Sequence, residues 1–295
     1  MSSEFSLKRN ARTFFLASIF LSRINYIKCS NLYNFCRYVD DLVDKKINNY
    51  TIKLNNIERQ LRRKDEITDR NVSSINFLIE KKMINFRNLL ELIKGIRFDN
   101  RMNYLKKKKE LINYSYLVAG TVGVMLCDLF RINNKQAYKF AVDLGIAMQL
   151  TNIARDVLED AKLQRVYIPS EWVKLNINEI LHPNFNSKKK IMIGTKKVLA
   201  IAEKYYKSAI TGLGYLPPRT RFAILFSLLV YREIGIKILR CNFSNMVKRE
   251  KLSAFEKFKC FFKCVVIFIF NRNVHKKNIK HKDFLHKDLD NSHAF

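Results

Sequence analysis

The sequence predicts an all-α protein built as one large domain. Only 8 glycines and 4 prolines occur in 295 residues, and the first proline is Pro169. More than half of the chain therefore lacks the strongest helix breaker. Apolar residues make up 48% of the chain, which is enough to bury a sizeable core. No alternating run of apolar and polar residues is long enough to indicate a sheet.

Apolar residues recur at helical spacing in a series of segments along the chain. The first clear amphipathic helix covers residues 31–44, and the polar stretch 45–75 indicates a surface loop with a short solvated helix. Further helices are predicted over residues 76–99, 104–131, 135–163, 187–212, 219–240 and 252–270. From residue 272 onward the chain is polar and basic, so we expect disorder there.

Two glycines, Gly120 and Gly123, lie inside the predicted helix over residues 104–131. Glycine costs stability in a helix interior. We therefore expect either a kink or a close approach to a neighbouring helix or a ligand at these positions.

The net charge of +29 suggests binding to nucleic acid or to an anionic membrane surface. The basic residues are mostly lysines, however, and they are scattered rather than interleaved with aromatic residues. Lysine, asparagine and isoleucine are all heavily used, which favours compositional drift as the explanation. A nonenzymatic, basic nucleic-acid-binding helical protein remains the alternative that explains the charge alone. A basic surface would also attract an anionic substrate or lipid leaflet.

The cysteines and histidines argue against a structural zinc site in the first half of the chain. Six cysteines occur without any CxxC pair, which is typical of reduced thiols in a cytosolic protein. All five histidines lie at or beyond His182. Residues 1–10 lack the apolar core of a signal peptide, and the longest apolar run near the end, 264–270, is too short to span a bilayer. We expect a cytoplasmic protein, with peripheral contact on the inner face of the membrane left open.

An acidic stripe lies on the predicted helix over residues 31–44. Arg37, Asp40, Asp41 and Asp44 occupy positions i, i+3, i+4 and i+7, so they share one helix face. Two carboxylates about 5 Å apart repel by roughly 3 kcal/mol at an effective dielectric constant near 20. A cation should offset this repulsion, and Mg²⁺ suits the position because it takes oxygen ligands and keeps sites open for phosphate.

A second polar stripe follows the predicted helix over residues 135–163. Gln149, Asn152, Asp156 and Asp160 again share one face. No lysine occurs from residue 149 to 161, although the chain is rich in lysine elsewhere. Either stripe alone could be an ordinary solvated helix face. Two such stripes on separate helices of one bundle instead predict metal ions held between them, which would bind a diphosphate.

These stripes resemble the two aspartate-rich motifs of the squalene/phytoene synthase family. Blocks similar to those of the family, in the same order, lie at residues 10–18, 32–44, 92–99, 114–123, 143–169 and 229–238. The last two blocks are most similar to the bacterial phytoene synthases of that family. The resemblance implies a prenyl diphosphate synthase-type all-α domain over residues 1–271, a single helical bundle around a central cavity of the isoprenoid synthase type. The basic tail, residues 272–295, lies outside this domain.

The resemblance also implies roles for individual residues. The metal ligands would be Asp40, Asp44, Asn152, Asp156 and Asp160. The catalytic residues would be Tyr114 and Gln149, near the reacting carbons, and the arginines Arg37 and Arg155. The substrate would be bound by Arg12, Thr13, Val118, Ala119, Gly123, Arg165, Tyr231 and Arg249.

The implied reaction is the head-to-head condensation of two geranylgeranyl diphosphates to phytoene, through a cyclopropylcarbinyl diphosphate, in carotenoid biosynthesis. Mg²⁺, or Mn²⁺ in its place, would be required, and no NADPH is expected because the product forms without a reductant. The product would pass to a downstream desaturase, and no nucleic acid would be bound. Two alternatives stay open: a squalene or dehydrosqualene synthase that uses farnesyl diphosphate, and an inactive relic of the family.

Overall fold

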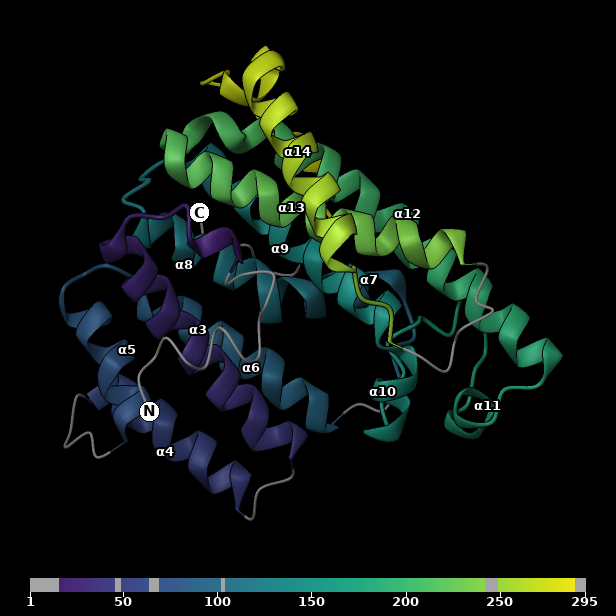
Figure 1. Ribbon diagram of the computed structural model, residues 1–295. Coiled ribbons are helices and arrows are strands. Elements are labelled where there is room, and N and C mark those ends of the chain that lie inside the picture. Colours follow the sequence, from purple (N-terminus) through teal and green to yellow (C-terminus); the bar gives the residue numbers. More distant parts are fainter. Residues whose placement is uncertain (1–15, 46–48, 64–68, 102–103, 242–248, 290–295) are drawn as a thin grey trace.

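The computed structural model describes residues 16–45, 49–63, 69–101, 104–241 and 249–289 (Figure 1). Across these residues the fold is all-α. The extended segments form one isolated bridge within this part of the chain, between Tyr104 and Val166. The predicted fold class is therefore confirmed.

Four helices form the N-terminal half of the bundle. They are α3 (Arg23–Asp44), α4 (Tyr50–Arg63), α5 (Arg70–Glu80) and α6 (Phe86–Arg101). Their apolar faces share a hydrophobic core with part of α8 (Thr121–Leu129). Ser22 caps the N-terminus of α3, because its side chain accepts a hydrogen bond from the backbone N–H of Asn25. The helix thus starts eight residues before the predicted helix and still ends at Asp44.

Two sequence predictions in this half are wrong. The stretch 45–75 is not chiefly loop, because α4 buries Leu54, Ile57 and Leu61, which recur on one helix face. The single helix predicted over residues 76–99 is broken between α5 and α6, where Lys82 adopts a positive φ of 52°. Apolar spacing resumes in phase after this turn, so periodicity alone does not reveal it.

The middle of the chain forms the centre of the bundle. Its elements are α7 (Lys108–Ser115), the π-helical turn η1 (Tyr116–Gly120), α8, α9 (Lys135–Arg155), α10 (Val157–Lys162) and α11 (Ile177–Leu181). Helix α9 packs against η1, α8 and two later helices. One described stretch, Lys108–Leu129, is long and apolar enough to cross a membrane, and 56% of the residues in its most apolar 18-residue window are buried in this fold. Such burial is typical of a core helix.

The close approach predicted at the glycines is confirmed. A Cβ atom at Gly123 would lie 2.3 Å from the carbonyl oxygen of Ala141, and one at Gly145 would lie 2.3 Å from that of Ala119. Only glycine therefore lets the η1–α8 segment lie directly against α9. The contact brings the backbone around Val118 to the centre of the bundle.

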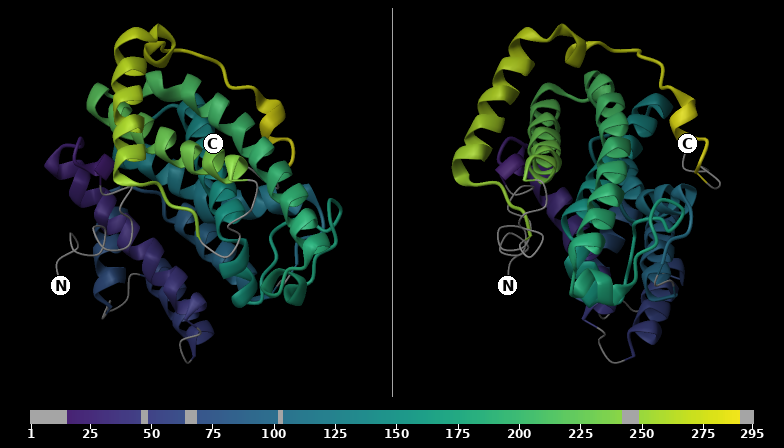
Figure 2. Two further views of the ribbon diagram at one scale, coloured as in Figure 1. Left: turned by 45° about the vertical axis from the view of Figure 1, so that its right-hand side comes forward. Right: turned by 90° about the vertical axis from the view of Figure 1, so that its right-hand side faces the viewer.

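The C-terminal half covers α9 from the other side. It contains α12 (Phe185–Thr211), η2 (Gly212–Tyr215), α13 (Pro218–Arg240), α14 (Ala254–Phe270), η3 (Arg272–His275) and η4 (Asp283–His286). Helices α12, α13 and α14 agree with the predicted ranges to within two residues at each end. Helix α14 lies on the outside of the bundle against α13 (Figure 2).

The last segment differs from the disordered tail that we expected. Residues 272–289 pack onto the bundle and fully bury Val274, whereas residues 290–295 lie outside the described part. Tyr215 Oη donates to the Ile279 carbonyl at 2.9 Å, and Tyr205 Oη donates to the Leu285 carbonyl at 2.8 Å. The amino-acid composition shows that this segment is charged, but it cannot show which distant residues the segment contacts.

Candidate active site

The first acidic stripe lies at the C-terminal end of α3. Arg37 pairs with Asp40 at 3.0 Å and also with Asp41. Arg165, which follows α10, donates to Asp44 Oδ1 at 2.7 Å. The opposite face of α3 is buried in the N-terminal core, so the stripe points away from that core and toward the segment after α10.

The second acidic stripe spans the junction between α9 and α10. The predicted continuous helix over residues 135–163 is interrupted at Asp156, whose φ and ψ are −106° and 20°. The side chain of Asp156 accepts two hydrogen bonds from Arg155, at 2.7 and 2.5 Å, and two from Arg249, at 2.8 and 3.0 Å. A single nonhelical residue leaves the polar spacing unchanged, so the sequence pattern continues through the break.

The two stripes converge on a shared group of carboxylates. Burial raises the pKa of Asp160 well above its usual range, and the negative charges of Asp156, Asp99 and Asp44 raise it further, against the opposing effect of Arg165. These interactions link acids from α3, α6 and the α9–α10 junction. Both stripes therefore belong to one electrostatic site.

Asp99, at the end of α6, is a site residue that the two sequence stripes do not include. Burial raises its pKa to about 6, while Arg165 and two tyrosine hydroxyls favour its ionised form. Tyr114 Oη donates to Asp99 Oδ2 at 2.9 Å, and Tyr167 Oη donates to Asp99 Oδ1 at 2.6 Å. The sequence offered one sign of this role, because Asp99 is the acidic residue that ends the largely apolar segment 92–99.

Tyr114 itself lies behind the acidic site. Its ring stacks on that of Tyr167 at a centroid distance of 4.8 Å, and it is not among the residues that line the apolar cavity along α9. Its position supports Asp99 directly. The predicted role of Tyr114 near the reacting carbons stays a prediction.

The oxygen atoms of this site suit a hard divalent cation. Among the described residues, the buried Oδ1 of Asn152 has no hydrogen-bond partner. Burial and the neighbouring charge of Asp44 raise the pKa of Asp40 to about 7, although Arg37 partly offsets this effect. An orphaned amide oxygen beside crowded carboxylates is an environment that Mg²⁺ or Mn²⁺ would stabilise. The residues present therefore fit the predicted metal ions.

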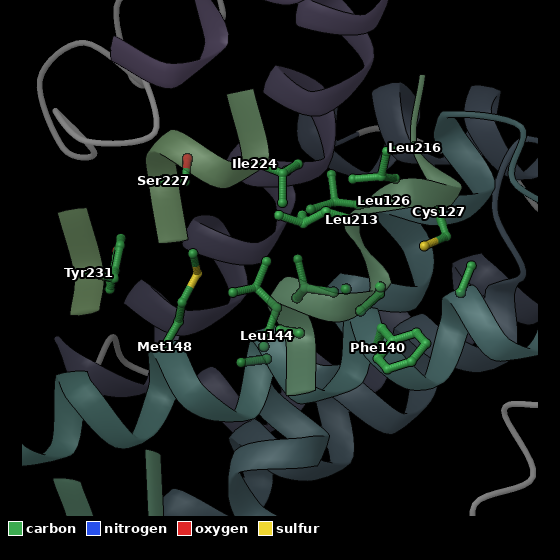
Figure 3. A pocket seen from close by; sticks show the side chains of 18 of the residues that line it. Leu126, Cys127, Phe140, Leu144, Met148, Leu213, Leu216, Ile224, Ser227 and Tyr231 are labelled. Carbon is green, nitrogen blue, oxygen red and sulfur yellow. The ribbon is translucent and has the colours of Figure 1, made fainter. Parts of the chain in front are cut away.

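An elongated apolar cavity of about 230 Å³ adjoins the acidic site along α9. Figure 3 shows Tyr231 and Met148 toward one end and Phe140 and Cys127 toward the other. Six of the predicted site residues line the cavity: Val118, Ala119, Gly123, Gln149, Asn152 and Tyr231. The remaining lining is mostly aliphatic or aromatic.

Tyr231 and Asn152 connect the cavity to the acidic site. Burial raises the pKa of Tyr231, Asp156 raises it further, and Arg155 and Arg249 act in the opposite direction. The hydroxyl therefore lies in the field of the same charged groups that surround Asp156. A ligand could place its charged end among these groups and its apolar chain in the cavity.

Comparison with known proteins decides the family. The family model for squalene/phytoene synthase matches residues 7–256. The chain belongs to the squalene/phytoene synthase family. The members of this family are prenyltransferases, and so is this chain. Family membership therefore favours an enzyme over the alternative of a nucleic-acid-binding protein.

Individual relatives agree with the family assignment. The 15-cis-phytoene synthase of Enterobacter agglomerans is 30% identical over 243 residues, covering 77% of this chain and 81% of the relative. The phytoene synthase of Pseudescherichia vulneris is 29% identical over 240 residues, covering 77% and 78%. The crystal structure of a dehydrosqualene synthase in complex with a ligand superposes with a TM-score of 0.77 at 26% identity, covering 89% of this chain and 94% of that one.

Two of the family-based assignments, Arg12 and Thr13, lie outside the described residues. The other predicted arginines all contact an acid of one of the two stripes, as described above for Arg37, Arg155, Arg165 and Arg249. The fold thus brings the predicted charged residues of this squalene/phytoene synthase family member together, whereas their roles in catalysis stay predictions.

The raised pKa of Asp40 predicts how pH affects the metal-free protein. The folded state favours the protonated form of the Asp40 carboxyl. Its contribution to the free energy of unfolding is therefore complete below the ordinary carboxyl pKa and is lost as pH rises through about 7. Added Mg²⁺ should therefore raise Tm more at pH 8 than at pH 5. Thermal unfolding at both pH values, with and without Mg²⁺, measures this difference.

The variant Asp40→Asn provides the control for this pH effect. It should reduce the difference between the Mg²⁺-induced Tm shifts at the two pH values, because the asparagine cannot titrate. The same difference in Asp40→Asn and in the unaltered protein would show that Asp40 is not responsible. Changes in overall charge affect both proteins equally and cancel in this comparison.

Proposed function

We propose that this enzyme condenses two geranylgeranyl diphosphates head to head to form phytoene, with Mg²⁺ and without a reductant. The observation that carries the proposal is the cluster of carboxylates and arginines at one end of a long apolar cavity. The cluster is suited to two diphosphates with their metal ions, and the cavity to prenyl chains. Similarity to bacterial phytoene synthases supports the choice of product.

The length of the cavity favours a long prenyl chain. Its lining extends along α9 from Asn152 to Ala137, a span of about 22 Å at the helical rise per residue. This accommodates an extended C20 chain and leaves space beyond a C15 chain. An apolar lining also excludes water, which would otherwise quench a carbocation.

The charged residues would bind and orient the diphosphates. Asp40, Asp44, Asn152 and Asp156, with Asp160 completing the acidic face, would hold the metal ions, whose charge would neutralise the departing diphosphate. Arg37, Arg155, Arg165 and Arg249 already lie beside these carboxylates, where they can donate to phosphate oxygens. Tyr231 lies where the charged and apolar regions meet.

The reaction would proceed through two ionisations. Loss of the first diphosphate leaves an allylic cation, which the double bond of the second substrate attacks to give a cyclopropylcarbinyl diphosphate. A second ionisation, a rearrangement and loss of a proton then give a conjugated triene. No electron donor is consumed, which distinguishes this route from squalene formation.

Product analysis tests this proposal. Purified protein is incubated with Mg²⁺ and either geranylgeranyl or farnesyl diphosphate, with and without NADPH, and the extracted hydrocarbon is identified. We expect a C40 triene that forms without NADPH. A C30 product would replace the proposal with a squalene or dehydrosqualene synthase, and the absence of any product would favour an inactive relic.

Helix α14 supports a peripheral contact with the membrane as part of this function. Six large apolar side chains on one of its faces are 39–76% exposed: Phe255, Phe258, Phe262, Val266, Ile269 and Phe270. Exposed lysines, Lys259 and Lys263, lie beside this stripe, and the whole chain carries a charge of +29. An apolar stripe with basic flanks fits an anionic bilayer. We propose that the hydrocarbon product leaves through this bilayer toward a downstream desaturase.

The membrane contact predicts a specific loss of vesicle binding. Phe258→Glu together with Phe262→Glu should reduce co-sedimentation with phosphatidylglycerol-containing vesicles at least 10-fold, because two carboxylates would enter the interface. Phe185→Glu removes another exposed phenylalanine at the start of α12 and should bind normally. If the double variant binds vesicles as well as the unaltered protein does, α14 does not face the membrane. A loss of self-association in the double variant, without a loss of vesicle binding, would instead show that the stripe packs against a second copy of the chain.

A further inference from the structure

A second cluster of side chains, of the types that can bind a metal ion, lies away from the aspartate-rich site, where the C-terminal segment meets α9. It consists of Asp143 on α9 and of His281 and His286, whose ligand atoms all lie within 4.8 Å of one another. The side chains of Asp143 and His281 are fully buried, and that of His286 is 8% exposed. A carboxylate in such a position requires close partners, because an uncompensated buried charge is costly.

Both imidazoles direct the same ring nitrogen at this carboxylate. His281 Nε2 lies 2.8 Å from Asp143 Oδ2, and His286 Nε2 lies 2.8 Å from Asp143 Oδ1. On the other side of its ring, His281 Nδ1 lies 3.2 Å from Asp283 Oδ1. That carboxylate oxygen also accepts from Lys139 Nζ at 2.6 Å.

The carboxylate behind His281 has a chemical consequence. If Nδ1 carries the proton that Asp283 accepts, a neutral His281 directs the lone pair of Nε2 at an oxygen lone pair of Asp143. The two lone pairs repel unless a cation lies between them. A histidine that donates one ring N–H to a carboxylate and presents its other nitrogen to a cation is the usual arrangement around protein-bound zinc.

We propose that Asp143, His281 and His286 bind one transition-metal ion of the zinc class. Two imidazoles and one carboxylate are ligands that Zn²⁺ prefers, whereas Mg²⁺ avoids imidazole. Bonds of about 2 Å in a tetrahedral shell separate ligand atoms by roughly 3.3 Å. The pairs that now lie 2.8 Å apart therefore need to open only slightly, and a water can fill the fourth position beside His286.

The ion would fasten the C-terminal segment to the far end of the cavity. Asp143 lies about 13 Å along α9 from Asn152, so the two metal sites are separate. The His281 ring packs edge-on against Phe140, which lines the cavity, at a centroid distance of 5.1 Å. This segment lies beyond residue 256, where the family match ends. Metal binding at this position is independent of the proposed reaction.

Cobalt spectroscopy of the full-length protein tests the site. Protein stripped of metal with a chelator is held in excess Mg²⁺, which occupies the aspartate-rich site, and is titrated with Co²⁺ and then Zn²⁺. We expect one Co²⁺ per chain with the visible absorption of a four-coordinate site, and its displacement by Zn²⁺. His281→Ala and His286→Ala should lose this absorption, whereas His182→Ala should keep it. Asp283→Asn should weaken binding about 10-fold, since it removes only the orienting carboxylate.

A second readout covers variants that fold poorly. Zn²⁺ should slow tryptic cleavage after Lys280 and Lys282, which are exposed, in the unaltered protein but not in the folded, conservative variant His286→Gln. Absence of Co²⁺ absorption in the unaltered protein would overturn the proposal, as would its persistence in the His281→Ala, His286→Ala double variant. Loss of the absorption in Asp40→Asn with Asp156→Asn would also overturn it, because the ion would then lie in the aspartate-rich site.

Discussion

Replacing Asp156 with asparagine is expected to lower the rate of product formation by about 10³-fold, which corresponds to the several kcal/mol that a metal-bound charge contributes to a transition state. Asp156 accepts hydrogen bonds from both Arg155 and Arg249, and it is a proposed metal ligand. The asparagine keeps the shape of the side chain and removes its charge. The measurement is kcat as a function of Mg²⁺ concentration, with the fold checked by circular dichroism.

Glu203→Gln is the matched control for this variant. Glu203 is a carboxylate bound at 2.7 Å by both Nε and Nη2 of Arg232, but it lies between α12 and α13 and does not line the cavity. It should retain product formation within a few-fold of the unaltered enzyme. A similar loss in both variants would mean that breaking any such ion pair disturbs the fold, and Asp156 would have no special role.

Replacing Gly145 with valine is expected to cause a large loss of stability. A Cβ atom at this position would lie 2.3 Å from the carbonyl oxygen of Ala119 and 2.8 Å from the Cα of Gly120. These are backbone atoms, so α9 and η1 would have to separate. We expect a destabilisation of about 3 kcal/mol or more, seen as a decrease in Tm of at least roughly 6 °C.

Gly235→Ala separates this steric effect from the general effect of changing a helical glycine. Its new Cβ would contact the end of the Leu199 side chain at 3.1 Å, and that side chain can adjust. Because alanine is a better helix former than glycine, Tm should stay the same or rise slightly. A tolerated Gly145→Val variant, with Tm unchanged, would show that α9 and η1 do not depend on this contact.

The fold class is confirmed, and the structure brings many of the predicted site residues together, because both depend on regular spacing within one helix. The apolar stripe of α3 and the polar positions around Asn152 can be identified without knowledge of any neighbouring element. The same reasoning missed two helix breaks. The turn between α5 and α6 leaves the apolar spacing in phase, and the nonhelical residue Asp156 does not alter the polar spacing around it.

The sequence by itself determined that the chain is all-α and that two of its helices have an acidic face. These faces also carry the resemblance to the squalene/phytoene synthase family. Only the tertiary structure revealed that Asp99 joins the acidic site and that Asp143 meets His281 and His286. These partners lie on different elements, and Asp143 and His281 are 138 residues apart in sequence. Helical periodicity describes which face of an element is apolar, but the packing of glycine-bearing helices decides which polar groups meet. The physical reason is that a buried charge is stabilised by whichever partners the fold brings within a few ångströms.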